Sequence, residues 1–546
     1  MRFSASGFEP YESEIRRTAS EMARDDIVAR IWRKDASVWK DEDIEISDRL
    51  GWLEAPDRAE GLLPGVEAFV REVREAGCEQ ALLLGMGGSS LAPEVFSRVF
   101  GARKGFLTLD VLDSTDPEAV LGAAEKRDWE RTIVLASSKS GTTLETVSLL
   151  NFFYARALEA LGRERTGAHF AAITDPGTPL ETAARELGFR RVFSGEEDIG
   201  GRFSVLSAFG LVPAALLGMD IPRLLAGARR AAGACRTAPP LENPGAALGL
   251  RLGILAGAGR DKPTFLITPK IESFGSWLEQ LLAESTGKEG RGILPLIREA
   301  RASFERGAPD RVAVHIGIGG DRSQDDELGR IKQSGMPLIS FSLEDLNELG
   351  SQFFLWEMAT AVAGYTLKVN PFDQPNVAAS KKKTEALLKL REAPGGRSGA
   401  DAGAAENELR PFLSRAQAGD YVAVQAFLPP APGIRGRLEE FAAALRSGTG
   451  LPVVCDFGPR FLHSTGQLHK GDRGNGLFIQ LTAGHSRDAQ VPAGPGSSVT
   501  RYSFGTLIDA QASGDRQALR EKSRRILHFH FPGGAEDGLR RLIESL

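Results

Sequence analysis

The sequence predicts an α/β fold built from two doubly wound parallel sheets with helices on both faces, a three-layer αβα sandwich. Short apolar strands alternate with helical stretches, a pattern that favours right-handed crossovers between parallel strands. Two of these strands lead directly into loops rich in Gly, Ser and Thr. The chain has 546 residues, more than one ordinary hydrophobic core can organise, so we expect several domains.

The first predicted domain spans 66–236 and follows a charged, helical N-terminal segment, 1–65. Its expected strands are Gln80–Leu84, Leu107–Leu112, Thr132–Ala136, Phe170–Thr174 and Arg191–Phe193. Helices are expected between the strands, including Leu91–Phe100 and Leu144–Leu161. Because ligands of such sheets bind at the carboxyl ends of the strands, the loops that follow the strands are the places to look for a site.

A proline-rich stretch near residue 237 predicts the start of a second α/β domain, 237–391. Its expected strands are Pro263–Thr268, Arg311–Gly317 and Pro337–Ser342. The segment 392–407 has the composition of a flexible loop. We expect 408–546, a further α/β segment, to complete the second domain with strands at Tyr421–Phe427, Leu451–Phe457 and Leu477–Leu481.

The composition excludes several classes of protein. A formal net charge of -5 argues against nucleic acid as the main partner. Apolar runs stay well short of the roughly 20 residues that a membrane helix needs, so no membrane partner is expected. The first residues lack the apolar core of a signal peptide, which makes the cytoplasm the expected compartment. Three widely separated cysteines predict neither a disulfide framework nor a zinc site.

The two loops carry the strongest chemical signal. One is Gly85-Met86-Gly87-Gly88-Ser89-Ser90, and the other is Ser137-Ser138-Lys139-Ser140-Gly141-Thr142-Thr143. Backbone N–H groups at the start of the helix after each loop attract anions, and the hydroxyls add donors. Together they suggest the phosphate of a small ligand. The alternatives are a tight turn without a ligand for the first loop, and for the second a self-capped helix start in which Thr143 is the cap and Glu145 assists.

Five segments resemble the sugar-isomerase (SIS) domains of the glucose-6-phosphate isomerase family. They are Gly85–Pro93, Ser138–Glu145, Asp198–Gly210 with its specific Gly-Gly-Arg-Phe-Ser sequence, Ala283–Lys288, and Phe372-Asp373-Gln374 with Lys381 seven residues later. The tail segment Leu462–Gly471 resembles the isomerase half of bacterial proteins in which a transaldolase is fused to this isomerase. The resemblance implies interconversion of glucose 6-phosphate and fructose 6-phosphate, a step of glycolysis and gluconeogenesis.

The resemblance also implies a role for individual residues. The phosphate would bind Ser138, Ser140, Thr142 and Thr143, with positive charge from Lys139. Gly88, Ser89, Gln280 and Gln374 would contact the rest of the substrate. The catalytic set would be Glu284, Arg202, Lys381 and His469. His463 stays open as an alternative to His469.

These residue types suit aldose–ketose isomerisation, which moves a proton between adjacent carbons through an enediol. A carboxylate such as Glu284 can take and return the proton, and the permanent charge of Arg202 can stabilise the enediolate. His469 and Lys381 would supply the acid and base that open the hexose ring. The reaction requires no cofactor or metal, and we find no side chains at metal-ligand spacing.

Plainer interpretations stay open for four of these residues. His469 could be an ordinary loop residue. Glu284 could be a helix-end carboxylate bonded to Ser285 or Thr286. Arg202 could pair with Asp198 at the surface, and Lys381 could belong to a solvated helix face. At the level of function, the alternatives are a non-catalytic regulator that binds sugar phosphates and an isomerase for another phosphosugar such as mannose 6-phosphate.

The sequence departs from the family in two places. After Gln374 the chain reads Pro375-Asn376-Val377 where the family has a Gly-Val-Glu core, so the position of Lys381 rests on its spacing. In ordinary members the histidine precedes this lysine, whereas His469 follows it. The family's histidine comes from the neighbouring subunit, so the resemblance implies a homodimer. It also implies transaldolase as a functional neighbour.

Overall fold

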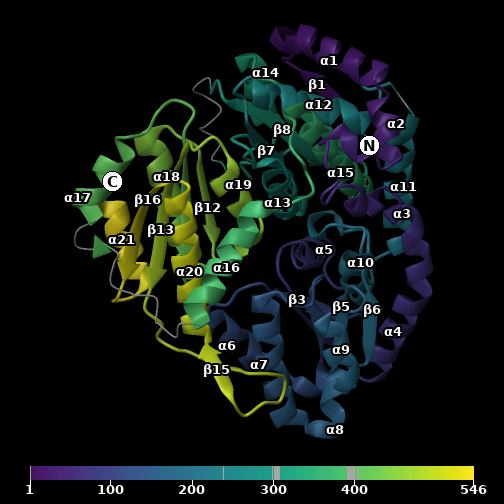
Figure 1. Ribbon diagram of the computed structural model, residues 1–546, viewed down its shortest axis with the longest axis vertical. Coiled ribbons are helices and arrows are strands. Elements are labelled where there is room, and N and C mark those ends of the chain that lie inside the picture. The colour runs from purple at the N-terminus through teal and green to yellow at the C-terminus, as the bar shows by residue number, and fades with distance from the viewer. Residues whose placement is uncertain (1, 238, 298, 300–307, 390–399, 402–404) are drawn as a thin grey trace.

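The computed structural model describes residues 2–237, 239–297, 299, 308–389, 400–401 and 405–546, and Figure 1 shows their arrangement. The described chain contains three mainly parallel sheets, each packed against helices. It also contains a small antiparallel hairpin. This architecture confirms the predicted α/β class. Among the described helices, none is both long enough and apolar enough to cross a membrane.

The first sheet has the strand order β3-β2-β4-β5-β6, with all neighbours parallel. Its strands are β2 (Gln80–Leu84), β3 (Thr108–Leu112), β4 (Thr132–Ser137), β5 (Phe170–Thr174) and β6 (Arg191–Ser194). Alternate residues enter different cores: Leu83 packs with the cluster on one face and Leu82 with the cluster on the other. Burial on both faces explains why the inner strands β2, β4 and β5 are largely apolar, whereas the edge strands β3 and β6 keep exposed polar residues.

Helices cover both faces of this sheet. They are α4 (Leu63–Glu75), α5 (Leu91–Phe100), α6 (Pro117–Glu125), α7 (Leu144–Leu161), α8 (Arg163–Thr166), α9 (Pro179–Glu186) and α10 (Ala208–Leu216). The order of the strands places β2 between β3 and β4, so the chain reverses direction across the sheet at β2. A crevice at such a switch point is where ligands of open α/β sheets bind. The two Gly- and Ser-rich loops follow β2 and β4, on either side of this point.

The second sheet contains β7 (Lys262–Ile267), β8 (Arg311–Ile318) and β9 (Leu338–Leu343) in parallel, with β1 (Arg2–Ser6) antiparallel along β9. The N-terminal segment was expected to be helical throughout, so β1 is a difference from the prediction. Around this sheet lie α1 (Glu12–Arg24), α2 (Ile27–Trp32), α3 (Ala55–Arg58), α11 (Ile221–Thr237), α12 (Pro244–Gly257), α13 (Phe274–Thr286), α14 (Asp325–Ser334) and α15 (Leu349–Leu367). α15 is buried along almost its whole length.

The sequence predicts that the strands after residue 408 extend the second sheet. They form a separate third sheet instead. Its order is β10-β16-β13-β11-β12. The strands are β10 (Ala400–Asp401), β11 (Tyr421–Phe427), β12 (Val453–Phe457), β13 (Gly476–Ala483) and β16 (Arg525–Phe531). Both edges of the second sheet are already occupied, because β1 pairs with β9 and Leu296 bridges to Thr264 of β7.

Helices α17 (Ala405–Leu413), α18 (Pro432–Thr449), α19 (Gly466–Gly471), α20 (Phe504–Glu521) and α21 (Ala535–Glu544) flank the third sheet. We call this sheet and its helices the C-terminal unit, residues 400–401 and 405–546. Of the predicted loop 392–407, residues 392–399 and 402–404 lie outside the described residues. α16 (Pro375–Lys389) precedes the loop and packs along α20.

The C-terminal unit is fastened to the first sheet at several points. The hairpin of β14 (Gln490–Pro492) and β15 (Thr500–Ser503) lies on α7, where the hydroxyls of Tyr502 and Ser148 are 2.9 Å apart. Asn151 on α7 donates to the Pro492 carbonyl oxygen at 3.0 Å. Arg460 pairs with Asp113, just beyond β3, at 2.7 Å. Segments separated by 341 to 354 positions in the sequence therefore lie side by side, and Figure 1 shows the hairpin beside α6 and α7.

Candidate active site

A cavity of about 730 Å³ lies at the switch point of the first sheet. Side chains from the first domain, from the helices next to the second sheet and from the C-terminal unit line it. Among the predicted site residues, those that line it are Gly88, Ser89, Lys139, Ser140, Thr143, Arg202, Gln280, Glu284, Gln374 and Lys381, and His463 lines it as well. Residues separated by almost four hundred positions in the sequence therefore surround one space.

The glycine loop after β2 is shaped for close packing. Gly87 has a φ of +57°, which favours glycine, and a Cβ there would lie 2.8 Å from the side-chain nitrogen of Gln280. A Cβ on Gly88 would overlap the carbonyl oxygen of Gly201 and lie 3.0 Å from the backbone nitrogen of Arg202. The absence of side chains thus lets this loop rest directly against the loop that carries Arg202.

The second loop ends at Thr143, immediately before the first residue of α7. Gly141 turns it with a φ of +66°. The hydroxyl of Thr142 donates to Ser140 Oγ at 3.1 Å, and Ser138 Oγ donates to Thr143 Oγ1 at 3.0 Å. The Thr143 side chain does not cap α7, contrary to the self-capped alternative. The first N–H groups of this 18-residue helix therefore keep their capacity to bind an anion.

Two of the predicted phosphate contacts, Ser138 and Lys139, are not free to bind the phosphate as expected. Ser138 is buried behind the loop and is not among the residues that line the cavity. Lys139 lines the cavity, but its ammonium group lies 2.6 Å from Asp175 and donates to the Glu196 carbonyl oxygen at 2.7 Å. Its charge is therefore largely compensated. The cation that faces the loop is Lys381 on α16, which lines a smaller cavity of about 120 Å³ together with Ser140 and Thr143.

The Gly-Gly-Arg loop and α13 bring Arg202 to Glu284. Arg202 Nη1 lies 3.4 Å from Glu284 Oε1, and both side chains are about 95% buried. Within the described chain this Nη1 has no hydrogen-bond partner, whereas Nη2 donates to the carbonyl oxygens of Phe372 and Asp373 at 2.5 and 2.8 Å. Asp198, the other candidate partner of Arg202, pairs instead with Arg58 at 2.9 Å.

Gln280 connects the carboxylate to the C-terminal unit. Its side-chain nitrogen donates to Glu284 Oε2 at 3.0 Å and to the backbone oxygen of His463 at 2.7 Å. The two residues are one helical turn apart on α13, so both side chains leave the same face of the helix. Glu284 is thus held by Gln280 and Arg202, and the interpretation of Glu284 as a helix-end carboxylate bonded to Ser285 or Thr286 finds no such bond in the described chain.

A second cation, Lys288, lies close to this pair. Its ammonium group donates to the carbonyl oxygens of Asn370 and Asp373 at 2.5 and 2.6 Å and pairs with the Asp373 carboxylate at 2.5 Å. Burial and the neighbouring Arg202 lower the pKa of Lys288 to about 7. Lys288 and Arg202 together fix the backbone that precedes Gln374.

His463 forms a buried pair with Glu145, near the first turn of α7. The ring nitrogen Nε2 of His463 lies 3.0 Å from Glu145 Oε1. Burial alone raises the pKa of Glu145, but His463 and Lys381 outweigh it and lower the pKa to about 2. An ionised carboxylate can only accept, so it holds a proton on Nε2 and leaves Nδ1 as the other acid–base position of the ring.

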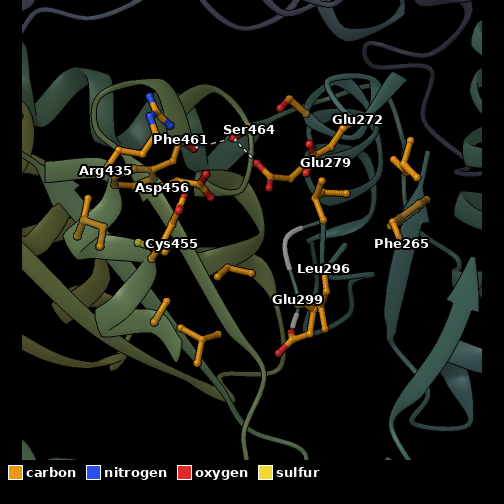
Figure 2. A pocket seen from close by; sticks show the side chains of 18 of the residues that line it. Phe265, Glu272, Glu279, Leu296, Glu299, Arg435, Cys455, Asp456, Phe461 and Ser464 are labelled. Atoms are coloured by element: carbon orange, nitrogen blue, oxygen red, sulfur yellow. Dashed lines mark hydrogen bonds between the residues drawn. The ribbon is translucent and has the colours of Figure 1, made fainter. Parts of the chain in front are cut away.

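The segment that carries His463 is also supported from its far side. Ser464 Oγ donates to Glu279 Oε1 of α13 at 3.5 Å. Figure 2 shows this contact between Ser464 and Glu279 at the edge of a separate cavity of about 540 Å³, which lies between the C-terminal unit and the second sheet. Gln280 and Glu279 of α13 therefore hold the backbone around His463 in place.

His469 does not reach the cavity. It is 2% exposed, and its ring packs against Tyr421, Phe461 and Phe478 with centroids 5.1 to 6.3 Å away. Nδ1 lies 3.3 Å from the Gln425 amide nitrogen. Burial in this aromatic cage, with Lys470 and Arg524 nearby, holds the pKa of His469 well below its usual range. A neutral, enclosed ring is unsuited to protonating a substrate, so the structure favours His463.

Sequence reasoning proposed Glu145 only as a helix-cap assistant. It gave no role to Lys288 or to Gln511 on α20, whose side-chain nitrogen donates to Glu145 Oε1. A carboxylate two residues after the phosphate loop was the one signal for Glu145. Nothing in the sequence around Gln511 points to the first domain, because its contact depends on how the C-terminal unit docks. Within the described residues we find no group of three or more His, Cys, Asp and Glu side chains that could hold a metal ion.

The family model described as phosphoglucose isomerase matches residues 74–293. A probable glucose-6-phosphate isomerase of Methanococcus maripaludis is 30% identical over 344 residues, which are 56% of this chain and 77% of the relative. A glucose-6-phosphate isomerase of Rubrobacter xylanophilus is 30% identical over 406 residues, which are 63% of this chain and 90% of the relative.

Two crystal structures share the fold. A hypothetical protein from Thermus thermophilus superimposes with a TM-score of 0.61 at 24% identity and covers 71% of this chain and 100% of its own. A glucose-6-phosphate isomerase from Chlamydia trachomatis gives a TM-score of 0.53 at 20% identity, with 71% and 81% of the two chains covered. At these identities the structures support the fold alone.

Proposed function

The chain belongs to the phosphoglucose isomerase family and is an aldose–ketose isomerase for D-glucose 6-phosphate and D-fructose 6-phosphate; we propose that the cavity at the switch point of the first sheet carries out this reaction. One observation carries the proposal. A buried carboxylate, a buried guanidinium, a carboxylate–histidine pair and an uncapped helix start all face a single cavity.

The phosphate of the substrate is assigned to the start of α7. The N–H groups of this helix and the hydroxyls of Ser140 and Thr143 supply hydrogen-bond donors, and Lys381 supplies the positive charge. Binding the phosphate away from the reacting carbons orients the sugar chain and supplies binding energy for the chemical step. The sugar itself lies toward Gly88, Ser89 and Gln374 in this proposal.

Ring opening is assigned to His463 and Lys381. The imidazole exchanges a proton with the ring oxygen while Glu145 stabilises the charged ring that results. Lys381, which lines both cavities, is the second acid–base group. The sequence predicts His469 for this role. We assign it to His463 because the ring of His469 is enclosed in the aromatic cage.

Isomerisation is assigned to Glu284 with Arg202. Glu284 takes the proton from one carbon and returns it to the neighbouring carbon, so a single carboxylate serves both half-reactions. The oxygen of the enediolate gains negative charge, and the donor of Arg202 Nη1 that lacks a hydrogen-bond partner in the described chain is available for it. Gln280 holds Glu284 in position throughout.

Three further points are proposals that the family resemblance supports. We expect a cytoplasmic enzyme, a homodimer, and transaldolase as a functional neighbour. The pairing of His463 with Glu145 lies within one chain, so a dimer is not needed to complete this arrangement.

The experiment is a coupled assay with glucose-6-phosphate dehydrogenase on fructose 6-phosphate, with mannose 6-phosphate as the comparison substrate. We expect turnover of fructose 6-phosphate and little of the mannose compound. A folded protein that binds fructose 6-phosphate without converting it would contradict the proposal and favour a regulator. Faster conversion of mannose 6-phosphate would move the activity to another phosphosugar.

A further inference from the structure

A second side chain bonds to the Glu145 carboxylate. Gln511 on α20 donates from its side-chain nitrogen to Glu145 Oε1 at 2.8 Å. Its side-chain oxygen accepts a hydrogen bond from Thr115 Oγ1 at 2.6 Å. Thr115, Gln511 and Glu145 are all at least 95% buried. The mechanism described above gives no role to Gln511 or Thr115.

The direction of this chain of bonds follows from the chemistry of its members. The carboxylate of Glu145 can only accept, so the amide nitrogen of Gln511 is the end that faces it. The amide oxygen then faces Thr115, whose hydroxyl donates. Each group thereby fixes the next, from Thr115 through Gln511 to Glu145 and on to His463.

Gln511 contacts the same oxygen of Glu145 that pairs with His463. Glu145 Oε1 receives both the Gln511 amide at 2.8 Å and the His463 ring nitrogen at 3.0 Å. A carboxylate that rotates about its last torsion would break both bonds together, so Gln511 restricts that rotation. Hydrogen-bond partners of this kind fix the ring orientation and the tautomer of a functional histidine.

We propose that Gln511 is a positioning residue for ring opening, which acts by holding Glu145 against His463. The inference rests on the proposed function, since it assumes that His463 works on the substrate. Gln511 and His463 both belong to the C-terminal unit, whereas Glu145 and Thr115 belong to the first domain. Packing of the C-terminal unit against the first domain therefore brings both His463 and Gln511 to Glu145.

The competing interpretation is that Gln511 only joins the two units. A double-mutant cycle separates the two interpretations, because residues that act through one another give non-additive losses, whereas a loss of folded protein adds to any other loss. The test uses the full chain with Gln511→Leu, His463→Gln and the two changes combined. Gln517→Leu is the matched control, because Gln517 lies exposed on the same helix.

We expect Gln511→Leu to lower kcat/KM on fructose 6-phosphate by about 10- to 100-fold. In the His463→Gln background the same change should cost less than about threefold, because its route of action is already lost. Gln511→Glu keeps the size of the side chain but sets a carboxylate against Glu145, so we expect a loss at least as large as that of Gln511→Leu. Gln517→Leu should leave kcat/KM unchanged.

Two results would overturn the inference. One is an equal loss for Gln511→Leu in both backgrounds, and the other is a Gln511→Leu or Gln511→Glu enzyme within threefold of wild type. If Gln511→Leu fails to fold, Thr115→Val gives the same test, since it removes only the hydroxyl that orients the amide. A fully active His463→Gln enzyme would refute the proposed role of His463 itself, a result that the single variant reports separately.

Discussion

The contact between Gly88 and the Arg202 loop gives a prediction whose size follows from the structure. In Gly88→Ala the added methyl group would overlap the carbonyl oxygen of Gly201 and lie 3.0 Å from the backbone nitrogen of Arg202. Both neighbours are backbone atoms, so no side chain can turn aside. The two loops must separate by about 1 Å to remove the overlap, and Arg202 moves with its loop.

A displacement of about 1 Å at a reacting group costs roughly 10²-fold in rate, or about 2.7 kcal/mol of transition-state stabilisation. We therefore expect kcat/KM on fructose 6-phosphate to fall about 100-fold in Gly88→Ala. The strain should also lower the free energy of unfolding by about 1–3 kcal/mol. The coupled assay measures the first quantity, and urea unfolding measures the second.

Gly122→Ala is the matched control. Gly122 lies within α6, and a Cβ there meets no atom within 4 Å. This change should leave kcat/KM unaltered and raise the free energy of unfolding by about 0.5–1 kcal/mol, because alanine favours a helix. A Gly88→Ala enzyme with kcat/KM within threefold of wild type would refute the argument that this contact sets the position of Arg202.

Three further predictions concern the histidines, pH and assembly. His463→Gln should lower kcat/KM at least 100-fold, whereas folded His469→Gln should keep activity within tenfold of wild type; the reverse order would restore His469 as the ring-opening group. The pKa of Glu145 falls from its usual value of 4.5 to about 2 on folding, so its ionisation stabilises the fold above pH 4.5 and this contribution is lost as the pH falls from 4.5 toward 2. The difference in unfolding free energy between wild type and Glu145→Gln should therefore shrink below pH 4.5, and a constant difference in urea titrations would contradict this. If one chain completes the site, specific activity should stay constant on dilution from micromolar to nanomolar enzyme, even where light scattering shows a dimer dissociating; loss of activity with dissociation would show that a partner is needed.

The first domain could be predicted closely because its signals are local. Each strand such as Gln80–Leu84 or Thr132–Ser137 is a continuous apolar run, and each is followed by its turn and helix. The family resemblance of the Gly-Gly-Arg segment and of the segment around Glu284 implied one site for Arg202, Gln280 and Glu284, and all three line the cavity. The strands and turns themselves depend on neighbours in sequence.

The remaining features depend on contacts between distant segments. His463 and His469 are six residues apart, and only the path of the chain through α19 decides which ring faces the cavity and which enters the aromatic cage of the third sheet. Lys139 was predicted to add positive charge at the phosphate site, but it pairs with Asp175, which follows the next strand. The separate third sheet likewise follows from β1, which occupies an edge of the second sheet.

The most direct measurement of the central claim is fructose 6-phosphate turnover by wild type and Glu284→Gln, with both proteins shown to be folded. The substitution keeps the shape of the side chain but removes the base. The proposed mechanism predicts a loss in kcat of about 10²- to 10⁴-fold with KM changed little. A Glu284→Gln enzyme that retains more than a tenth of the wild-type kcat would contradict the assignment of Glu284 as the proton-transfer base.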